Sequence, residues 1–444
     1  MALVTAPATP SSSAHDGAAL RDPGIDLVRA LCVVGVVLLH AIMVGVTVED
    51  GAPVFENASV GTWWIVPVSW LLQVMPLFFV IAGFSGLLSY RRHRVRGGSD
   101  TAFVAARVHR LLRPALYAVG IVGAALTVLV LCGIPADFVV TAGFRYGQPL
   151  WFLAVFLACQ ALLPTLARMH EDAPLLSIGA LSTLAVTVDI LRALTGNDGL
   201  GFLNLAFVWI ALQQLGFFLA DGTIDALARR TRGVLALSAT TALFLACAFG
   251  IFSPDLIANI NPPTTALLLV GLAHTSVLSL YRSRVIGFSR RPLVARITAF
   301  ITPRTMTMYL WHMPVLLTMA GLTAAFALQS GQSLPALSSV DWWMQRPLWL
   351  VTTLALTALA ALLLARWESG VPAPSTSGAA VTGAVLLGVG GTLGLLILGT
   401  SPLTAAFAVG LYVLALRLAV RRSPARPEGY ARPRALSASP TSSA

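Results

Sequence analysis

Long apolar runs follow one another along nearly the whole chain, and short polar connections separate them. Most runs are about 20 residues long, the length that an α-helix needs to cross the hydrocarbon core of a bilayer. The apolar residues within each run are continuous rather than alternating, which favours helices over the strands of a membrane barrel. The pattern predicts twelve spanning helices, near residues 25–48, 62–89, 115–134, 149–168, 174–194, 201–220, 233–252, 263–281, 304–328, 347–366, 379–399 and 403–420.

The overall composition agrees with this pattern. Of the 444 residues, 57% are hydrophobic and 11% are charged, and the mean hydropathy of +0.82 excludes an ordinary soluble protein. We therefore expect an all-α fold, a polytopic transmembrane helix bundle. A loop of small residues at 369–378 sets the last two spans apart. This predicts a ten-helix core over residues 21–368 and two additional helices within 369–420.

The charge of the chain follows the predicted topology. All 29 basic residues are arginines, and the formal net charge is +11. If the N-terminus is cytoplasmic, the cytoplasmic connections carry nearly all of these arginines, and the opposite side carries only Arg145, Arg192 and Arg346. This bias obeys the positive-inside rule and places both termini in the cytoplasm. It also explains the positive charge without a nucleic-acid partner.

The two ends of the chain lack the apolar pattern. Residues 1–20 are rich in Ala, Ser, Thr and Pro, without the basic and apolar regions of a signal peptide, and we expect a disordered leader. Residues 421–444 predict a disordered basic tail. The four cysteines lie in apolar spans without metal-ligand or disulfide spacing, so we expect neither a metal site nor a disulfide.

The first span carries polar side chains that are costly to place in lipid. Within DLVRALCVVGVVLLHA (26–41), Arg29 and His40 are separated by close to three helical turns, so both project from one face. Asp26 lies one turn before Arg29 and can pair with it. Such intramembrane groups usually face the bundle interior and mark functional sites. Two structural alternatives stay open, since Arg29 can snorkel to the headgroups and His40 can form a helix–helix hydrogen bond.

A second cluster of charges precedes the third predicted span. Arg107, Arg110 and Arg113 recur every three residues on a short helix that we expect to end before Pro114. Planar guanidinium groups can grip phosphate oxygens in bidentate fashion, which predicts a phosphate-containing ligand. The alternative is that these arginines serve only to orient the protein in the membrane or to contact anionic lipid.

Several stretches resemble, in order, those of the membrane-bound acyltransferase family 3, a bacterial O-acyltransferase family. They are IDLVRALCVVGVVLLHA (25–41), PLFFVIAGFSGLL (76–88), AARVHRLLRPALY (105–117), PLWFLAVFLACQALLP (149–164), TMTMYLWHMPVLL (305–317) and RPLWLVTTLALTALAALLLARWE (346–368). The resemblance covers roughly residues 20–368. It implies a ten-helix bundle in a bacterial plasma membrane that moves an acyl group, commonly acetyl, from a coenzyme A thioester to a hydroxyl.

The resemblance also assigns residues. The family's first-helix histidine and arginine fall on His40 and Arg29. Its R-x-x-R motif falls on Arg107 and Arg110, with Arg110 and Arg113 as an alternative register. These assignments coincide with the two polar clusters that the apolar pattern already singles out.

Three other features match the family less closely. The histidine of YLWHMPV falls on His312, for which structural hydrogen bonding and catalysis both stay open. Ala82, in IAGF, stands where the family commonly has a serine, which puts a polar role there in doubt. The family does not normally require the last two helices, and the sequence assigns them no function.

Together these features predict an integral-membrane O-acyltransferase. The arginine cluster would hold the phosphate-bearing end of acyl-CoA, a donor substrate rather than a resident cofactor, and no metal is required. The thin pantetheine arm would pass between helices towards His40, the expected general base, while Arg29, oriented by Asp26, would align it. Direct attack on the thioester and a transient acyl-histidine both stay open.

The acceptor is expected to be a hydroxyl of a cell-envelope sugar, a glycolipid or a metabolite. A multi-pass transporter or flippase of a small polar or lipid-linked substrate is the main alternative, because it also fits twelve helices with intramembrane charges. Against it, the sequence shows no half-to-half repeat. A non-catalytic membrane scaffold would bind no acyl-CoA at all.

Overall fold

The computed structural model describes residues 22–368 and 373–420, so the predicted leader 1–20 and tail 421–444 lie outside the described residues. The helices of the first half are α1 (Pro23–Met43), α2 (Ile65–Leu72), α3 (Met75–Val95), α4 (Asp100–Leu131), α5 (Ala136–Gly147), α6 (Trp151–Asp172), α7 (Pro174–Thr195) and α8 (Asn204–Ala220). Those of the second half are α9 (Thr223–Ala226), α10 (Arg229–Ala248), α11 (Ala266–Ser289), α12 (Pro292–Ile301), α13 (Thr305–Ser330), α14 (Val340–Glu368), α15 (Gly378–Ile397) and α16 (Pro402–Leu418).

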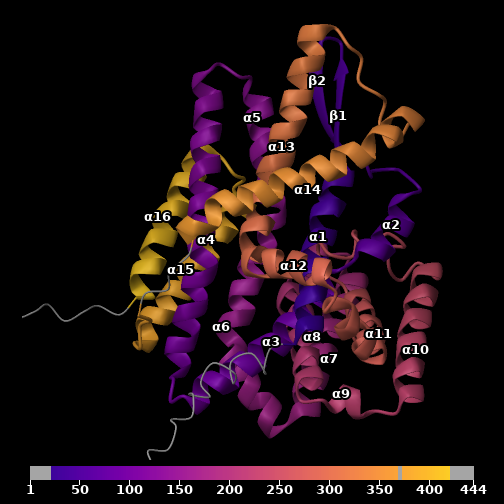
Figure 1. The fold of residues 1–444 in the computed structure, drawn as a ribbon, viewed down its shortest axis with the longest axis vertical. Coiled ribbons are helices and arrows are strands. Elements are labelled where there is room, and N and C mark those ends of the chain that lie inside the picture. The colour runs from indigo at the N-terminus through magenta and orange to yellow at the C-terminus, as the bar shows by residue number, and fades with distance from the viewer. Residues whose placement is uncertain (1–21, 369–372, 421–444) are drawn as a thin grey trace, which may run out of the picture.

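This architecture confirms the predicted all-α polytopic bundle (Figure 1). Eleven helical stretches of the described residues are long and apolar enough to cross a membrane, and α16 is a shorter apolar helix. Eleven of the twelve predicted spans each overlap one of these stretches, and the last overlaps α16. In Figure 1, α10 lies at one margin of the bundle, while α15 and α16 lie at the other, beside α4.

The first predicted span is wrong beyond Met43. There α1 ends, and β1 (Val44–Glu49) pairs with β2 (Ala52–Asn57) in an antiparallel hairpin. Asp50 and Gly51 form its two-residue turn with φ of 50° and 75°, the positive values that a type I′ turn requires. The hairpin projects from one end of the bundle (Figure 1), which we call the hairpin end.

Two further predicted boundaries change. The span predicted at 62–89 is divided between α2 and α3, and the helix expected to end before Pro114 continues through it, so that α4 has 32 residues. A proline removes only one backbone donor, and the buried position of Pro114 lets neighbouring helices support the chain on both sides. The arginine cluster therefore begins the same helix that crosses the membrane. We call this end of the bundle, opposite the hairpin, the arginine-rich end (Figure 1).

At the centre of the bundle, α3 and α8 pack backbone against backbone. A Cβ atom on Gly83 would lie 2.0 Å from the carbonyl oxygen of Gln213, and one on Gly216 would lie 2.0 Å from the carbonyl oxygen of Val80. Helix pairs in membranes depend on small residues for such an approach. The two glycines thus set the spacing of the central helix pair.

Gly83→Ala is therefore expected to lower the free energy of unfolding by about 1–3 kcal/mol, because the added methyl group forces the two helices apart. Gly179, on α7, has no atom within 4 Å of its ideal Cβ position. Gly179→Ala should instead stabilise its helix slightly, since alanine favours helices over glycine. Thermal unfolding of both variants in the same detergent checks the opposite signs, and a stabilised Gly83→Ala would contradict the packing.

An ionic network joins three helices at the arginine-rich end. The carboxylate of Asp221, just after α8, forms an ion pair with Arg91 of α3 and lies 2.8 Å from Nε2 of His170 of α6. Partial burial acts to raise the pKa of Asp221, but the hydrogen bonds from Arg91 and His170 outweigh it and hold that pKa below its usual value. Arg91 and Arg94 both also pair with Glu171. Structural ion pairs thus account for these two arginines.

Candidate active site

His40 lines a large cavity near the hairpin end of the bundle. The cavity has a volume of about 680 Å³, within the range of pockets that hold small molecules. Most of its lining is apolar, and the side chains with polar atoms besides His40 are Glu56, Asn57, Gln73, Arg145, Gln148, Trp151, Asn261, Tyr309 and Thr400. The prediction that His40 faces the bundle interior is confirmed.

The hydrogen bond of His40 defines which ring nitrogen can react. Its Nδ1 lies 2.9 Å from the carbonyl oxygen of Val36, one turn earlier on α1. Because a carbonyl oxygen only accepts, Nδ1 carries the proton and Nε2 of the neutral ring keeps its lone pair. Nε2 is therefore the atom of His40 that can take a proton from a substrate.

A second histidine packs against His40. The ring of His312, on α13, lies edge-on to it with a centroid separation of 4.9 Å. Its Nδ1 donates to the carbonyl oxygen of Tyr309 at 2.5 Å, while its buried Nε2 has no hydrogen-bond partner in the described part of the chain. No group of three or more metal-ligating side chains forms among the described residues. The resemblance singles out His312, but nothing in the sequence predicts its contact with His40.

The end of α1 that carries His40 is held by α14. Nη1 of Arg346 donates to the carbonyl oxygens of Val44 at 3.2 Å and Ala41 at 3.5 Å, and Nε1 of Trp349 donates to Ala41 at 3.1 Å. These bonds satisfy carbonyl groups that the helix end leaves unpaired, where a positive charge is also favourable. The sequence identified Arg346 only as one of three arginines on the side of the membrane opposite the cytoplasm. Its contact with the end of α1 was therefore missed.

Arg29 lies three turns before His40 on α1 and points towards α3. Its guanidinium pairs with Asp26 at 3.0 Å, which confirms the predicted pairing. It also donates to Oγ of Ser85 at 2.5 Å. Ser85 follows Ala82 by one helical turn. A serine hydroxyl is thus present on this face of α3, one turn beyond the position where the family commonly has one.

The three arginines of the predicted cluster differ in their burial and in their contacts. Arg107 is half-buried, with its guanidinium 4.9 Å from the ring centroid of Phe103, and the positive charges of Arg29 and Arg110 act on it. Arg110 is exposed, and Arg113 is half-buried one turn further along α4. No carboxylate of the described residues forms an ion pair with Arg107 or Arg110. The positive charges of Arg110 and of Arg29 on α1 thus both act at Arg107, and this favours the Arg107 and Arg110 register.

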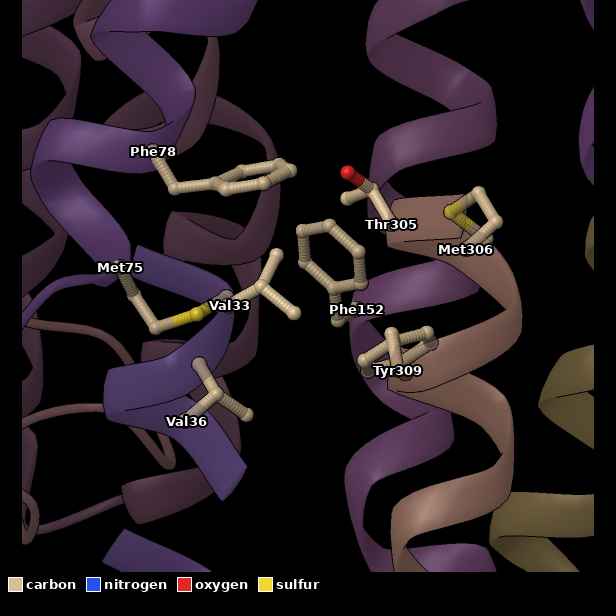
Figure 2. Close-up of a pocket in the computed structure, with 8 residues that line it drawn as sticks. All are labelled: Val33, Val36, Met75, Phe78, Phe152, Thr305, Met306 and Tyr309. Atoms are coloured by element: carbon tan, nitrogen blue, oxygen red, sulfur yellow. The ribbon is translucent and has the colours of Figure 1, made fainter. Parts of the chain in front are cut away.

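Apolar side chains fill the space along α1 between its two polar groups. Val33 of α1, Phe78 of α3 and Phe152 of α6 meet there, and Figure 2 shows both phenylalanine rings lying between α1 and α13. They leave a void of only about 20 Å³, room for about one water molecule. We call these three residues the apolar constriction.

The void adjoins the large cavity, because Val36 and Tyr309 are among the residues that line both. The sequence predicted that a thin substrate arm passes between helices towards His40. The small void lies on this route, but the apolar constriction closes it. A thin substrate chain can reach His40 from the arginine-rich end only if these side chains move.

Comparison with protein families decides the class of protein. A family model described as an acyltransferase domain matches residues 22–366. The chain belongs to acyltransferase family 3. It is accordingly a multi-pass membrane acyltransferase, as its resemblance implied. No curated protein and no solved structure matches it. The family match ends within α14, so α15 and α16 of this acyltransferase lie beyond it.

The hydrogen bonds from Arg346 and Trp349 to the end of α1 lead to a prediction for acyl transfer. Arg346→Ala is expected to lower kcat by up to about 100-fold, because a small displacement of His40 misaligns the reacting atoms. The KM for the donor should stay unchanged, and Arg346→Lys should recover part of kcat. Arg192→Ala is the matched control, since the ion pair that Arg192 forms within the described residues is with the exposed Asp198. Equal losses in kcat and in folded yield, without rescue by lysine, would contradict a positioning role.

Proposed function

We propose that this membrane acyltransferase moves an acyl group, acetyl as the first candidate, from acyl-CoA to a hydroxyl of an acceptor in the cavity. The observation that carries the proposal is the arrangement of α1. One end of this helix places His40, whose Nε2 keeps its lone pair, in the cavity lining, and the other places Arg29 where its positive charge acts on Arg107 of α4. The proposal requires no tightly bound cofactor.

The donor fits the arginine-rich end by charge. Coenzyme A carries several phosphates, and guanidinium groups without carboxylate partners suit phosphate oxygens. Neither Arg107 nor Arg110 forms an ion pair with a carboxylate of the described residues, and the positive charge of Arg29, held by Asp26 and Ser85, acts on Arg107. From there the pantetheine arm would follow α1, displace the apolar constriction and bring the thioester to His40.

The chemistry at His40 balances without a further reactant. The acceptor oxygen attacks the thioester carbonyl carbon while Nε2 of His40 takes the hydroxyl proton. The tetrahedral intermediate then collapses, the C–S bond breaks, and the departing sulfur takes the proton from the imidazolium. The products are an ester and free coenzyme A. His312, edge-on to His40, limits the rotation of its ring.

The distribution of arginines supports one orientation. By the positive-inside rule the arginine-rich end faces the cytoplasm, where acyl-CoA is made, and the hairpin end faces the outside of a bacterial plasma membrane. The acceptor would then enter the cavity from the side opposite the donor. Family membership favours this acyltransferase over the transporter or flippase that the sequence also allowed.

Thiol release from acetyl-, butyryl- and octanoyl-CoA by the purified protein tests the donor. We expect release of free coenzyme A, and the fastest thioester indicates the acyl chain length. Mass spectrometry of lipids, glycans and secreted metabolites from cells with and without the gene tests the acceptor, with one acyl mass as the expected difference. If no acyl-CoA is consumed and no product changes mass, the proposal is wrong.

A further inference from the structure

Beyond the family match, the end of α15 and the turn after it form one wall of the cavity that His40 lines. The cavity lining includes Leu393, Leu395, Leu396 and Ile397 near the end of α15, and Gly399 and Thr400 in the turn that leads to α16. The family match ends at residue 366, so these residues are an addition to the acyltransferase domain. A helix that only anchored the chain would have no reason to line the cavity.

The wall is seated firmly on the acyltransferase domain. A Cβ on Gly143 of α5 would lie 1.8 Å from the carbonyl oxygen of Thr400, and one on Gly388 of α15 would lie 2.7 Å from Leu112 of α4. The hydroxyls of Thr392 and Tyr412 bond α15 to α16 at 2.8 Å. Glycines at both contacts allow this close approach, so the position of α15 beside the cavity is well defined.

The chemistry of the wall differs from that of the hairpin side. Every cavity-lining side chain of α15 is aliphatic, whereas Glu56, Asn57 and Gln73 come from β2 and from the segment after α2. Aliphatic surface binds apolar groups and disfavours unpaired hydroxyls. At the end of the wall, the buried Oγ1 of Thr400 has no hydrogen-bond partner among the described residues. The α15 part of the lining is thus aliphatic up to Thr400, whereas the hairpin side also carries a carboxylate and amide groups.

We propose that the end of α15, held in place by α16, forms a subsite for the apolar part of the acceptor, and that the acceptor is an amphiphilic alcohol. One of its hydroxyls lies at His40, its polar groups face the hairpin side, and its apolar body lies on Leu393 and Ile397. The cavity volume limits the bound part to about the size of a drug-like molecule. This assignment rests on the proposed function and narrows its acceptor, since it excludes free, fully hydrophilic sugars.

Binding of a matched pair of probes tests the subsite. Octyl glucoside and glucose share one sugar and differ in the apolar chain, so we expect the protein in nanodiscs to bind octyl glucoside at least about tenfold more tightly, above the background of empty nanodiscs. Hexadecyl glucoside placed in the same nanodiscs separates the sources of the acceptor. Its binding indicates a lipid that enters from the bilayer, and binding of the octyl compound alone indicates a soluble molecule. Equal binding of glucose and octyl glucoside would overturn the proposal.

Two double variants locate the effect on the wall. Leu393→Ala with Ile397→Ala removes side chains that are 38% and 77% exposed, so the bundle keeps its core while octyl glucoside binds about tenfold more weakly. The control, Leu386→Ala with Leu403→Ala, changes exposed leucines of the same two helices that do not line the cavity, and should bind as the wild type does. Unchanged binding by the wall variant would overturn the assignment. Because no acyl donor is present, this result is independent of whether acyl-CoA is the donor.

Discussion

Replacing His40 by alanine lowers the rate of acyl transfer by about 10²–10⁴-fold, the usual contribution of a positioned general base. The reason is that the proposed proton acceptor is Nε2 of His40, a residue that lines the cavity and donates through Nδ1 to the carbonyl oxygen of Val36. The Kd for acyl-CoA should stay unchanged, because the arginines proposed to hold its phosphates lie near Arg29, three helical turns from His40. Product formation and equilibrium binding, measured on the same preparation, check both parts.

His274 supplies the matched control. It lies on α11, is not among the residues that line the cavity, and its Nδ1 has no partner in the described residues. His274→Ala should therefore keep its transfer rate, although it also removes an imidazole from the membrane region. If His40→Ala and His274→Ala lose activity equally, loss of packing rather than loss of a base is the cause. If neither loses activity, the assignment of His40 is wrong.

The second large effect is expected for the phosphate end of the donor. Arg107→Gln and Arg110→Gln should each raise the Kd for acyl-CoA by about ten- to a hundredfold, since each removes a charge-assisted hydrogen bond to phosphate. The rate at saturating donor should change little. The Kd of the wild type should also rise with salt, because exposed charges are screened.

Acyl-pantetheine sharpens this test because it has the thioester arm but no phosphate. The arginine variants should use it as well as the wild type does, whereas His40→Ala should not use it. Arg94→Gln is the control, because Arg94 is paired with Glu171 at the same end of the bundle and should not bind the donor. An equal defect of Arg107→Gln with both donors would show that Arg107 does not contact phosphate.

The number and order of the helices could be predicted because crossing a bilayer demands long apolar runs. The hairpin was missed for a related reason, since the apolar run of α1 continues into VGVTVE without a break. A short apolar run does not by itself distinguish helix from strand, although the Asp50–Gly51 pair is a typical hairpin turn. Pro114 led to the wrong prediction that a helix ends before it. Packing on both sides of α4 supports a helix that an isolated peptide would end there.

For the site, the sequence identified what lies along a single helix. The three-turn separation of Arg29 and His40, and the pairing of Arg29 with Asp26, follow from helical geometry alone. The contacts of His312 and Arg346 with the end of α1 join segments that are far apart in the chain, and no spacing rule predicts them. The role of α15 in lining the cavity was likewise hidden, because an apolar wall has the same composition as a lipid-facing helix.

The apolar constriction has a consequence for the cell as a whole. A permanently wet channel from the arginine-rich end to the cavity would let protons and small ions run down their gradients. With Val33, Phe78 and Phe152 in contact and space for about one water, this region is instead a dry electrical seal. If donor and acceptor enter from opposite sides as proposed, this seal lets the enzyme work in a membrane without dissipating its ion gradients.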